Sequence, residues 1–150
     1  MTQQTMETVV RDRDSDALYT VPASASVADA VEVMSSREVG AVLVMTEDGL
    51  VAGIFSERDL MLRVVRAGLD PKATPISLVM TRDVLFVSPG TTLEAALALM
   101  FVRRFRHLLV IDGPKVHGLV SMRDLAFQLI RGGEGRLEAA VRASHEGARP

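Results

Sequence analysis

The octapeptide Gly53-Ile-Phe-Ser-Glu-Arg-Asp-Leu60 occurs a second time in nearly the same form, as Gly118-Leu-Val-Ser-Met-Arg-Asp-Leu125. Both copies follow the pattern Gly-x-x-Ser-x-Arg-Asp-Leu, with an apolar stretch before it and another after it. A pattern repeated at a fixed spacing indicates a duplicated structural unit. We therefore expect the chain to contain two halves with the same fold.

The similarity extends outward from this motif. A constant shift along the chain aligns the apolar positions of the preceding segments, pairing Val21 with Val87, Val27 with Leu93, Ala30 with Ala96, Met34 with Met100 and Val44 with Val110. From the motif onward the shift is shorter by a single position, because a turn of the second copy has lost a residue. Surface turns tolerate such deletions, so the change of shift is compatible with two copies of one unit.

Each half has the pattern of a β-α-β-β-α unit. A short extended segment precedes a helix whose apolar residues recur at i, i+3, i+4 and i+7, starting at Val27 or Leu93. Two apolar strands and a final helix follow. The expected strands lie at 18–21, 41–45 and 51–55, then at 84–87, 107–111 and 116–120, and the final helices at 57–66 and 122–131.

A half of roughly 60 residues buries its apolar faces poorly by itself. We therefore predict an α+β fold with α/β-type layers, in which two tandem repeats pack about a pseudo-two-fold axis. The predicted division of the chain is an N-terminal extension (1–16), a first repeat (17–67), a turn-rich linker (68–82), a second repeat (83–131) and a flexible C-terminal tail (132–150).

The composition excludes several classes of protein. Lysine and arginine number 17 against 19 aspartates and glutamates, a net charge of −2 that argues against nucleic-acid binding. No cysteine is present, which excludes disulfides, thiolate–zinc sites and cysteine nucleophiles. No apolar run approaches the ~18 residues that span a membrane, and no secretory signal is visible. We expect a cytoplasmic protein without membrane contact.

Catalysis and metal binding have little support in the sequence. The histidines (His107, His117 and His145) lack the spacing of metal ligands, and no phosphate-binding loop or nucleophile motif is present. We expect no catalytic residue, no metal site and no enzymatic activity.

The repeated motif places polar groups where a strand runs into a helix. A helix N-terminus has free N–H groups and a partial positive charge, so it attracts anions. Ser56 and Ser121 add hydroxyls there, and Arg58 and Arg123 add positive charge. The same Ser-x-x-Asp pattern also predicts a capping box, in which the serine and the acid satisfy the backbone at the helix start. Both interpretations remain open from the residues alone.

The whole stretch from residue 18 to residue 130 resembles a tandem pair of CBS domains, the unit called a Bateman module. The resemblance rests on the β-α-β-β-α order, both Gly-x-x-Ser-x-Arg-Asp motifs, Val79-Met-Thr-Arg-Asp83 before the second copy and Phe105-Arg-His-Leu-Leu-Val-Ile-Asp112 before its hairpin. One departure is Leu108-Leu109, where the family often has Leu-Pro.

This resemblance implies a cleft between the repeats with two candidate nucleotide sites. Asp59 and Asp124 would hold ribose hydroxyls, and Ser56 and Ser121 would meet phosphate or ribose. Adenine would lie in an apolar slot, recognised by backbone groups near Val21 and Val87.

The two copies differ at the start of their second strands. The second copy has a cationic cluster there (Arg103, Arg104, Arg106 and His107), whereas the first has Arg37-Glu-Val-Gly-Ala41. The resemblance implies that Arg106 and His107 contact phosphates and favour a phosphorylated ligand. A solvated charged face is the alternative, and the sequence does not assign the cluster to either candidate site.

Together these features predict a regulatory module, which requires no cofactor and binds an adenine nucleotide as its ligand. AMP, ADP and ATP are the first candidates, with NAD(H) and S-adenosylmethionine as others. The final helices are apolar on more than one side, which predicts a homodimer. A separate regulated protein, unnamed, is expected to read the nucleotide state. The alternative function is a ligand-free adaptor that only dimerises.

Overall fold

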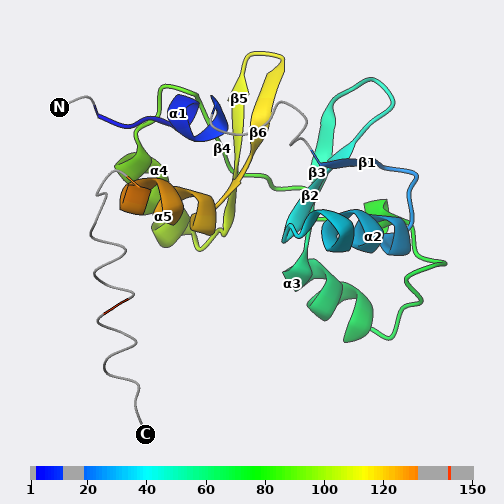
Figure 1. Cartoon of the computed structure of the whole chain (residues 1–150). Coiled ribbons are helices and arrows are strands. Elements are labelled where there is room, and N and C mark those ends of the chain that lie inside the picture. The colour runs from blue at the N-terminus through cyan, green and yellow to red at the C-terminus, as the bar shows by residue number, and fades with distance from the viewer. Residues whose placement is uncertain (1–2, 12–18, 132–141, 143–150) are drawn as a thin grey trace, which may run out of the picture.

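The computed structural model describes residues 3–11, 19–131 and 142. It contains two halves, each with a three-stranded sheet covered by helices (Figure 1). The predicted tail, 132–150, lies outside the described residues except for Arg142. Among the described residues, no helix is both long and apolar enough to cross a membrane.

The predicted β-α-β-β-α order is present in both halves. The first half comprises β1 (Thr20–Pro22), α2 (Val27–Arg37), β2 (Ala41–Met45), β3 (Val51–Ser56) and α3 (Glu57–Asp59), which continues as η1 (Leu60–Val65). The second comprises β4 (Phe86–Val87), α4 (Leu93–Arg103), β5 (His107–Asp112), β6 (Lys115–Ser121) and α5 (Met122–Arg131). Two short helices lie outside this order, α1 (Met6–Arg11) and η2 (Ile76–Leu78).

The two sheets share one topology. In each, the first strand pairs in parallel with the second, and the second pairs antiparallel with the third. Each hairpin has a bulge just before the motif glycine, since the register shifts after the pairs Val44–Gly53 and Val110–Gly118. A bulge bends its strand and increases the local twist. The duplicated sequence therefore produces the same irregularity twice, and the predicted fold class is confirmed.

The first half has a core of aliphatic side chains around Phe55. Val42 and Val44 of β2 belong to this core. Leu43 lies between them and is also buried, but it belongs to the core cluster of neither half. Successive strand residues point to opposite faces of a sheet. One face of β2 therefore packs under α2, and the other is also shielded from water.

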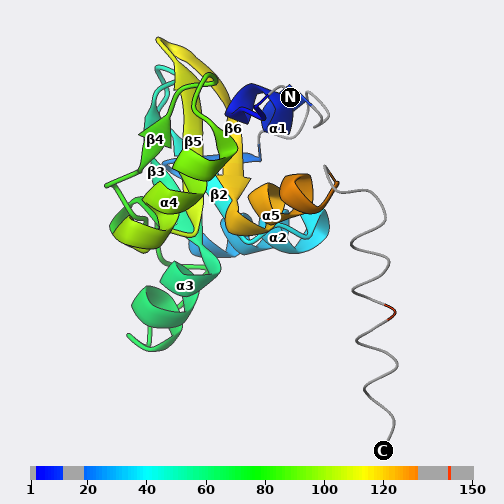
Figure 2. The same ribbon diagram turned by 90° about the vertical axis from the view of Figure 1, so that its left-hand side faces the viewer.

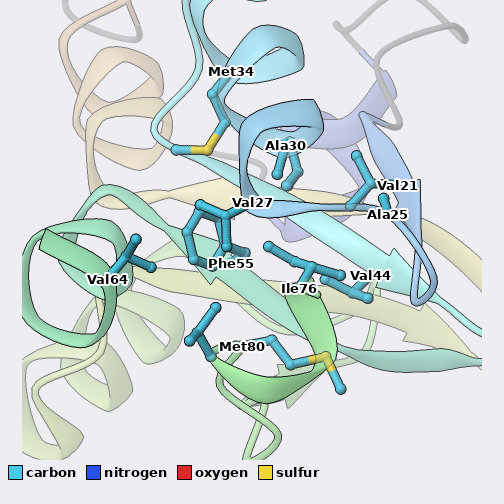
Figure 3. Close-up of a cluster of buried hydrophobic side chains, with 12 residues drawn as sticks. Val21, Ala25, Val27, Ala30, Met34, Val44, Phe55, Val64, Ile76 and Met80 are labelled. Carbon is cyan, nitrogen blue, oxygen red and sulfur yellow. The ribbon is translucent and has the colours of Figure 1, made fainter. Parts of the chain in front are cut away.

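The chain between the repeats contributes to the first core. Ile76, Val79 and Met80 are buried in the cluster of Phe55, and Figure 3 shows Ile76 and Met80 beside Phe55 and Val27. The Ile76 N–H donates to the Ala25 carbonyl at 2.8 Å. These residues lie within the predicted linker, so the segment is partly structural rather than only a connection.

The N-terminal segment makes the matching contacts with the second half. Met6 and Val9 are buried among the core residues of that half, and α1 lies beside β6 in both views (Figures 1 and 2). The Met6 N–H donates to the Thr91 carbonyl at 2.8 Å, as Ile76 does to Ala25. The predicted extension (1–16) thus supplies core residues to the second repeat. The six-residue α1 is too short for helical periodicity to reveal this.

Replacing Val9 with alanine is expected to lower the free energy of unfolding by about 1–2 kcal/mol, because the lost methyl groups leave a cavity in the second core. Glu7→Ala, on the exposed side of the same helix, serves as the matched control. Urea unfolding of both variants measures the difference. Equal stability of Val9→Ala and wild type would show that α1 is not needed for this core.

The helices of the two halves begin and end in similar ways. Ser26 caps α2 with a complete capping box, in which the Ser26 N–H donates to Asp29 at 2.9 Å. This hydrogen bond and one from the Ser26 hydroxyl lower the pKa of Asp29 below its ordinary value. The residues after α2 and α4, Glu38 and Arg104, are left-handed at φ 54° and 57°. This conformation is uncommon for residues other than glycine, and it turns the chain into β2 and β5.

The two final helices differ. The predicted helix 57–66 begins as α3, but its continuation η1 is a π-helix, with the Arg66 N–H donating to the Met61 carbonyl at 3.0 Å. Its counterpart α5 is a regular α-helix. Wide π turns are rare and frequently border functional sites. Here the wide turn borders a cleft between the halves.

Candidate functional site

A cleft of about 520 Å³ lies between the two halves. Four segments line it: the residue before β2, the end of β3 with the helix that follows, the chain leading into β4, and the chain between α4 and the start of β5. Its lining residues are Gly40, Ile54, Ser56, Glu57, Arg58, Asp59, Leu62, Arg63, Thr81, Asp83, Val84, Leu85, Arg104, Phe105, Arg106 and His107. The first copy of the repeated motif and the cationic cluster of the second copy therefore share one cavity.

Asp59 is buried at the wall of this cleft, with 6% of its surface exposed. One carboxylate oxygen, Oδ2, accepts hydrogen bonds from the Ser56 N–H at 3.0 Å and the Ser56 hydroxyl at 3.1 Å. The Asp59 N–H in turn faces Ser56 Oγ at 3.4 Å. The capping-box interpretation of the motif is therefore correct for this copy.

The second carboxylate oxygen of Asp59 has a different environment. Oδ1 accepts a hydrogen bond from the Thr81 hydroxyl at 2.9 Å, and Arg63 Nε lies 3.6 Å away. An ionised carboxylate can accept about four hydrogen bonds. The cap uses Oδ2, and Oδ1 keeps acceptor capacity beside the cavity. Capping and ligand binding are thus compatible functions of one carboxylate.

The second copy of the motif has the same local geometry. Asp124 Oδ2 accepts from the Ser121 N–H at 2.6 Å and from its hydroxyl at 2.8 Å, and Ser121 Oγ accepts from the Asp124 N–H at 3.1 Å. Ser121 and Asp124 do not line the cleft that contains Asp59, and Arg123 is exposed outside it. The lining of this cleft thus includes the first copy of the motif and not the second.

The cationic cluster divides between the cleft and the outer surface. Arg104, Arg106 and His107 line the cavity, whereas Arg103 does not. A smaller cavity of about 310 Å³ adjoins it and shares Arg58 and Arg106 with it. Arg104, Arg106 and His107 therefore lie at the cleft that contains Asp59, a placement that the sequence left open. Several cations gathered at one rim favour an anionic ligand.

The residues near which the resemblance implied adenine, Val21 and Val87, lie outside the lining of this cleft. Val21 and Val87 are buried in the cores of their own halves and do not line the cleft. Their side chains occupy the helix-facing side of each sheet. The chain just before β4 lines the cavity instead, through Val84 and Leu85.

Four polar residues of the cleft were not singled out from the sequence as site residues: Glu57, Arg63, Thr81 and Asp83. Thr81 lies within the Val79–Asp83 stretch that supports the family resemblance, so that stretch was a usable signal. No sequence signal pointed to Arg63, because an arginine in a helix usually has a solvated side chain. Among the described residues, no group of three histidines, aspartates or glutamates could hold a metal ion.

A sequence model of the CBS domain matches residues 10–66 and 76–131. The chain belongs to the CBS-domain family. CBS-domain proteins are generally regulatory and non-catalytic modules, and no catalytic family is indicated for this one.

Relatives of this CBS-domain protein occur in plants and bacteria. It is 35% identical over 142 residues to CBS domain-containing protein CBSCBSPB1 of Arabidopsis thaliana, covering 93% of this chain but 26% of the plant protein. It is 32% identical over 117 residues to CBS domain-containing protein YhcV of Bacillus subtilis, covering 78% of this chain and 82% of YhcV. The chain thus spans about a quarter of the length of CBSCBSPB1.

Solved structures share this CBS-pair fold. A putative signal-transduction protein with CBS domains from Burkholderia ambifaria superimposes with a TM-score of 0.79 at 35% identity, over 85% of this chain and 95% of that one. A CBS domain protein from Pyrobaculum aerophilum, PAE2072, solved in complex with AMP, has a TM-score of 0.71 at 21% identity, over 82% of this chain and 91% of that one. At that identity, the likeness to PAE2072 shows the fold alone.

Proposed function

We propose that this CBS pair binds an adenine nucleotide in the cleft between its repeats and passes the occupancy of that site to a partner protein. The observation that carries the proposal is the position of Asp59. Asp59 lines the cavity together with Thr81, which donates to its Oδ1 atom, and cations of the other repeat line the same cavity. One cleft thus contains a carboxylate, which complements the ribose diol of a nucleotide, and several cations, which complement its phosphate.

The three parts of the ligand have separate positions in this proposal. One ribose hydroxyl donates to the acceptor position of Asp59 Oδ1 that Thr81 does not use. The phosphate lies toward Arg58, Arg106 and His107, because charge-assisted hydrogen bonds to phosphate are the strongest polar contacts available there. Adenine occupies the apolar part of the wall, beside Val84 and Leu85. The AMP held by PAE2072, a protein of the same fold, supports this class of ligand.

The proposed signal transmission depends on the fact that residues of both halves line the cleft. A ligand that touches both halves stabilises the arrangement in which both sets of contacts are made. Only such a difference in affinity between two arrangements can shift their populations. We propose that AMP, ADP or ATP acts in this way, with NAD(H) and S-adenosylmethionine as further candidates.

A second candidate function is a dimerising adaptor without a ligand, and exposed apolar residues favour it. Phe101 and Val102 of α4 are 81% and 73% exposed, and Phe127 and Ile130 of α5 are also exposed. Large apolar patches on soluble proteins usually mark interaction sites. We propose that a second copy of the chain covers these helices, which is compatible with either function.

Thermal unfolding with AMP, ADP, ATP, NAD and S-adenosylmethionine, each tested separately, distinguishes the two functions. A nucleotide present at about 100 times its dissociation constant is expected to stabilise the protein by about 2.7 kcal/mol. GMP serves as the control for recognition of the base. If none of the adenine compounds raises the unfolding temperature, the sensor function is wrong and the adaptor function is favoured.

A further inference from the structure

Arg63 connects the candidate site to the segment that joins the two repeats. Its Nη1 donates to the carbonyls of Met80 at 3.0 Å and Val79 at 3.4 Å. Its Nε lies 3.6 Å from Asp59 Oδ1. Although the Arg63 side chain is 51% exposed, two backbone carbonyls and a carboxylate hold its guanidinium from different sides. A planar guanidinium has five donors in a fixed arrangement, which suits it to bridge such groups.

Thr81 approaches the same carboxylate oxygen from the joining segment. Its hydroxyl donates to Asp59 Oδ1 at 2.9 Å. Its backbone pairs with Ile54 of β3 through two hydrogen bonds of 2.8 and 2.9 Å. Asp59 Oδ1 is therefore held between a cation of η1 and a hydroxyl of the segment that leads into β4. Any group that binds Oδ1 from the cleft must share it with both.

The second repeat lacks this cation. The position that follows Asp124 by four residues is Gln128, where the first repeat has Arg63 after Asp59. Gln128 is buried and neutral, in a regular α-helix. The residue four positions after the motif aspartate thus differs between the two copies. An arginine four residues after the motif aspartate is a property of the first copy.

We propose that Arg63 is a positioning residue for the nucleotide: it holds Asp59 Oδ1 toward the ribose diol and links the occupied site to the segment that joins the repeats. This inference rests on the proposed function. In this proposal Arg63 acts through Asp59, since its Nε lies 3.6 Å from Asp59 Oδ1 while its Nη1 is bound to the carbonyls of Val79 and Met80. Its effect on affinity should therefore depend on the ribose hydroxyls rather than on the base or phosphate.

The test compares two ligands and three variants. AMP and 2′,3′-dideoxy-AMP, which lacks the diol, are titrated calorimetrically, with competition titration where binding is weak. Arg63→Gln introduces the residue that the second repeat has at this position, so the fold is expected to accept it. Arg63→Lys keeps the charge. Arg66→Gln is the matched control, because Arg66 is an exposed arginine of the same helical segment that does not line the cleft.

Arg63→Gln is expected to weaken AMP binding about tenfold and dideoxy-AMP binding less than about twofold, since only AMP uses the positioned carboxylate. Arg63→Lys should recover AMP affinity to within about threefold of wild type, and Arg66→Gln should leave both affinities unchanged. An equal loss for both ligands would overturn the inference, because a merely structural or phosphate-binding role predicts that result. Unchanged AMP affinity in Arg63→Gln would also overturn it.

Failure of the proposed function looks different. If wild-type protein binds neither AMP nor dideoxy-AMP, the nucleotide function is wrong, and the inference falls with it. If wild type binds AMP with a clear preference for the diol while Arg63→Gln behaves as wild type, only the assignment of Arg63 is wrong.

Discussion

Asp59→Ala is expected to reduce the affinity for AMP by about 10- to 100-fold. The substitution removes the acceptor of a ribose hydroxyl, and a hydrogen bond to a charged group contributes about 1.5–3 kcal/mol. It also leaves the Thr81 hydroxyl and the Arg63 guanidinium without their shared partner. Isothermal titration of AMP into wild type and variant measures the loss.

A second capping box in the same half provides the matched control. Asp29 bonds Ser26 at the start of α2 as Asp59 bonds Ser56, but Asp29 does not line the cleft. Asp29→Ala is therefore expected to remove a cap and leave AMP affinity unchanged. If Asp59→Ala binds AMP as tightly as wild type and only its stability falls, the carboxylate is a cap and nothing more.

Gly53→Ala is expected to lower the free energy of unfolding by about 2–4 kcal/mol, because forcing extra atoms into a packed site typically costs about 1–3 kcal/mol and a backbone clash costs more. A Cβ atom on Gly53 would lie 2.5 Å from the Thr81 carbonyl oxygen and 3.1 Å from the Met80 sulfur. The nearest atom belongs to backbone that is paired with Ile54, so it cannot move without loss of hydrogen bonds.

The other copy of the motif again supplies the control. A Cβ atom on Gly118 would meet Val10 Cγ1 at 3.6 Å, an ordinary van der Waals contact. Gly118→Ala is therefore expected to change the free energy of unfolding much less than Gly53→Ala does. Urea unfolding of both variants tests the contrast. Equal losses would show that the motif glycine is required for a reason common to both repeats rather than for the approach of Thr81.

The amino-acid sequence by itself determined the duplication and the β-α-β-β-α order, and it offered the capping box as one of two interpretations of the repeated motif. These features are local. Apolar residues at helical or strand spacing define which face is buried, and a serine three residues before an aspartate satisfies the backbone of a helix start wherever that helix lies. Ser56 and Asp59, like Ser121 and Asp124, form their hydrogen bonds within a single helical turn. Such contacts form within one repeat, so they can be predicted without reference to the other repeat.

Only the tertiary structure decided which groups meet across the repeats. Packing of the two halves brings Arg106 and His107 to the cleft of Asp59. The joining segment places Thr81 against the Asp59 carboxylate, and the N-terminal segment buries Met6 in the second core. The tertiary structure also places the side chain of Val21 in the core of the first half and that of Val87 in the core of the second half. These contacts join residues far apart in the chain, and their geometry depends on how both sheets bury their apolar faces together. No local pattern specifies that arrangement.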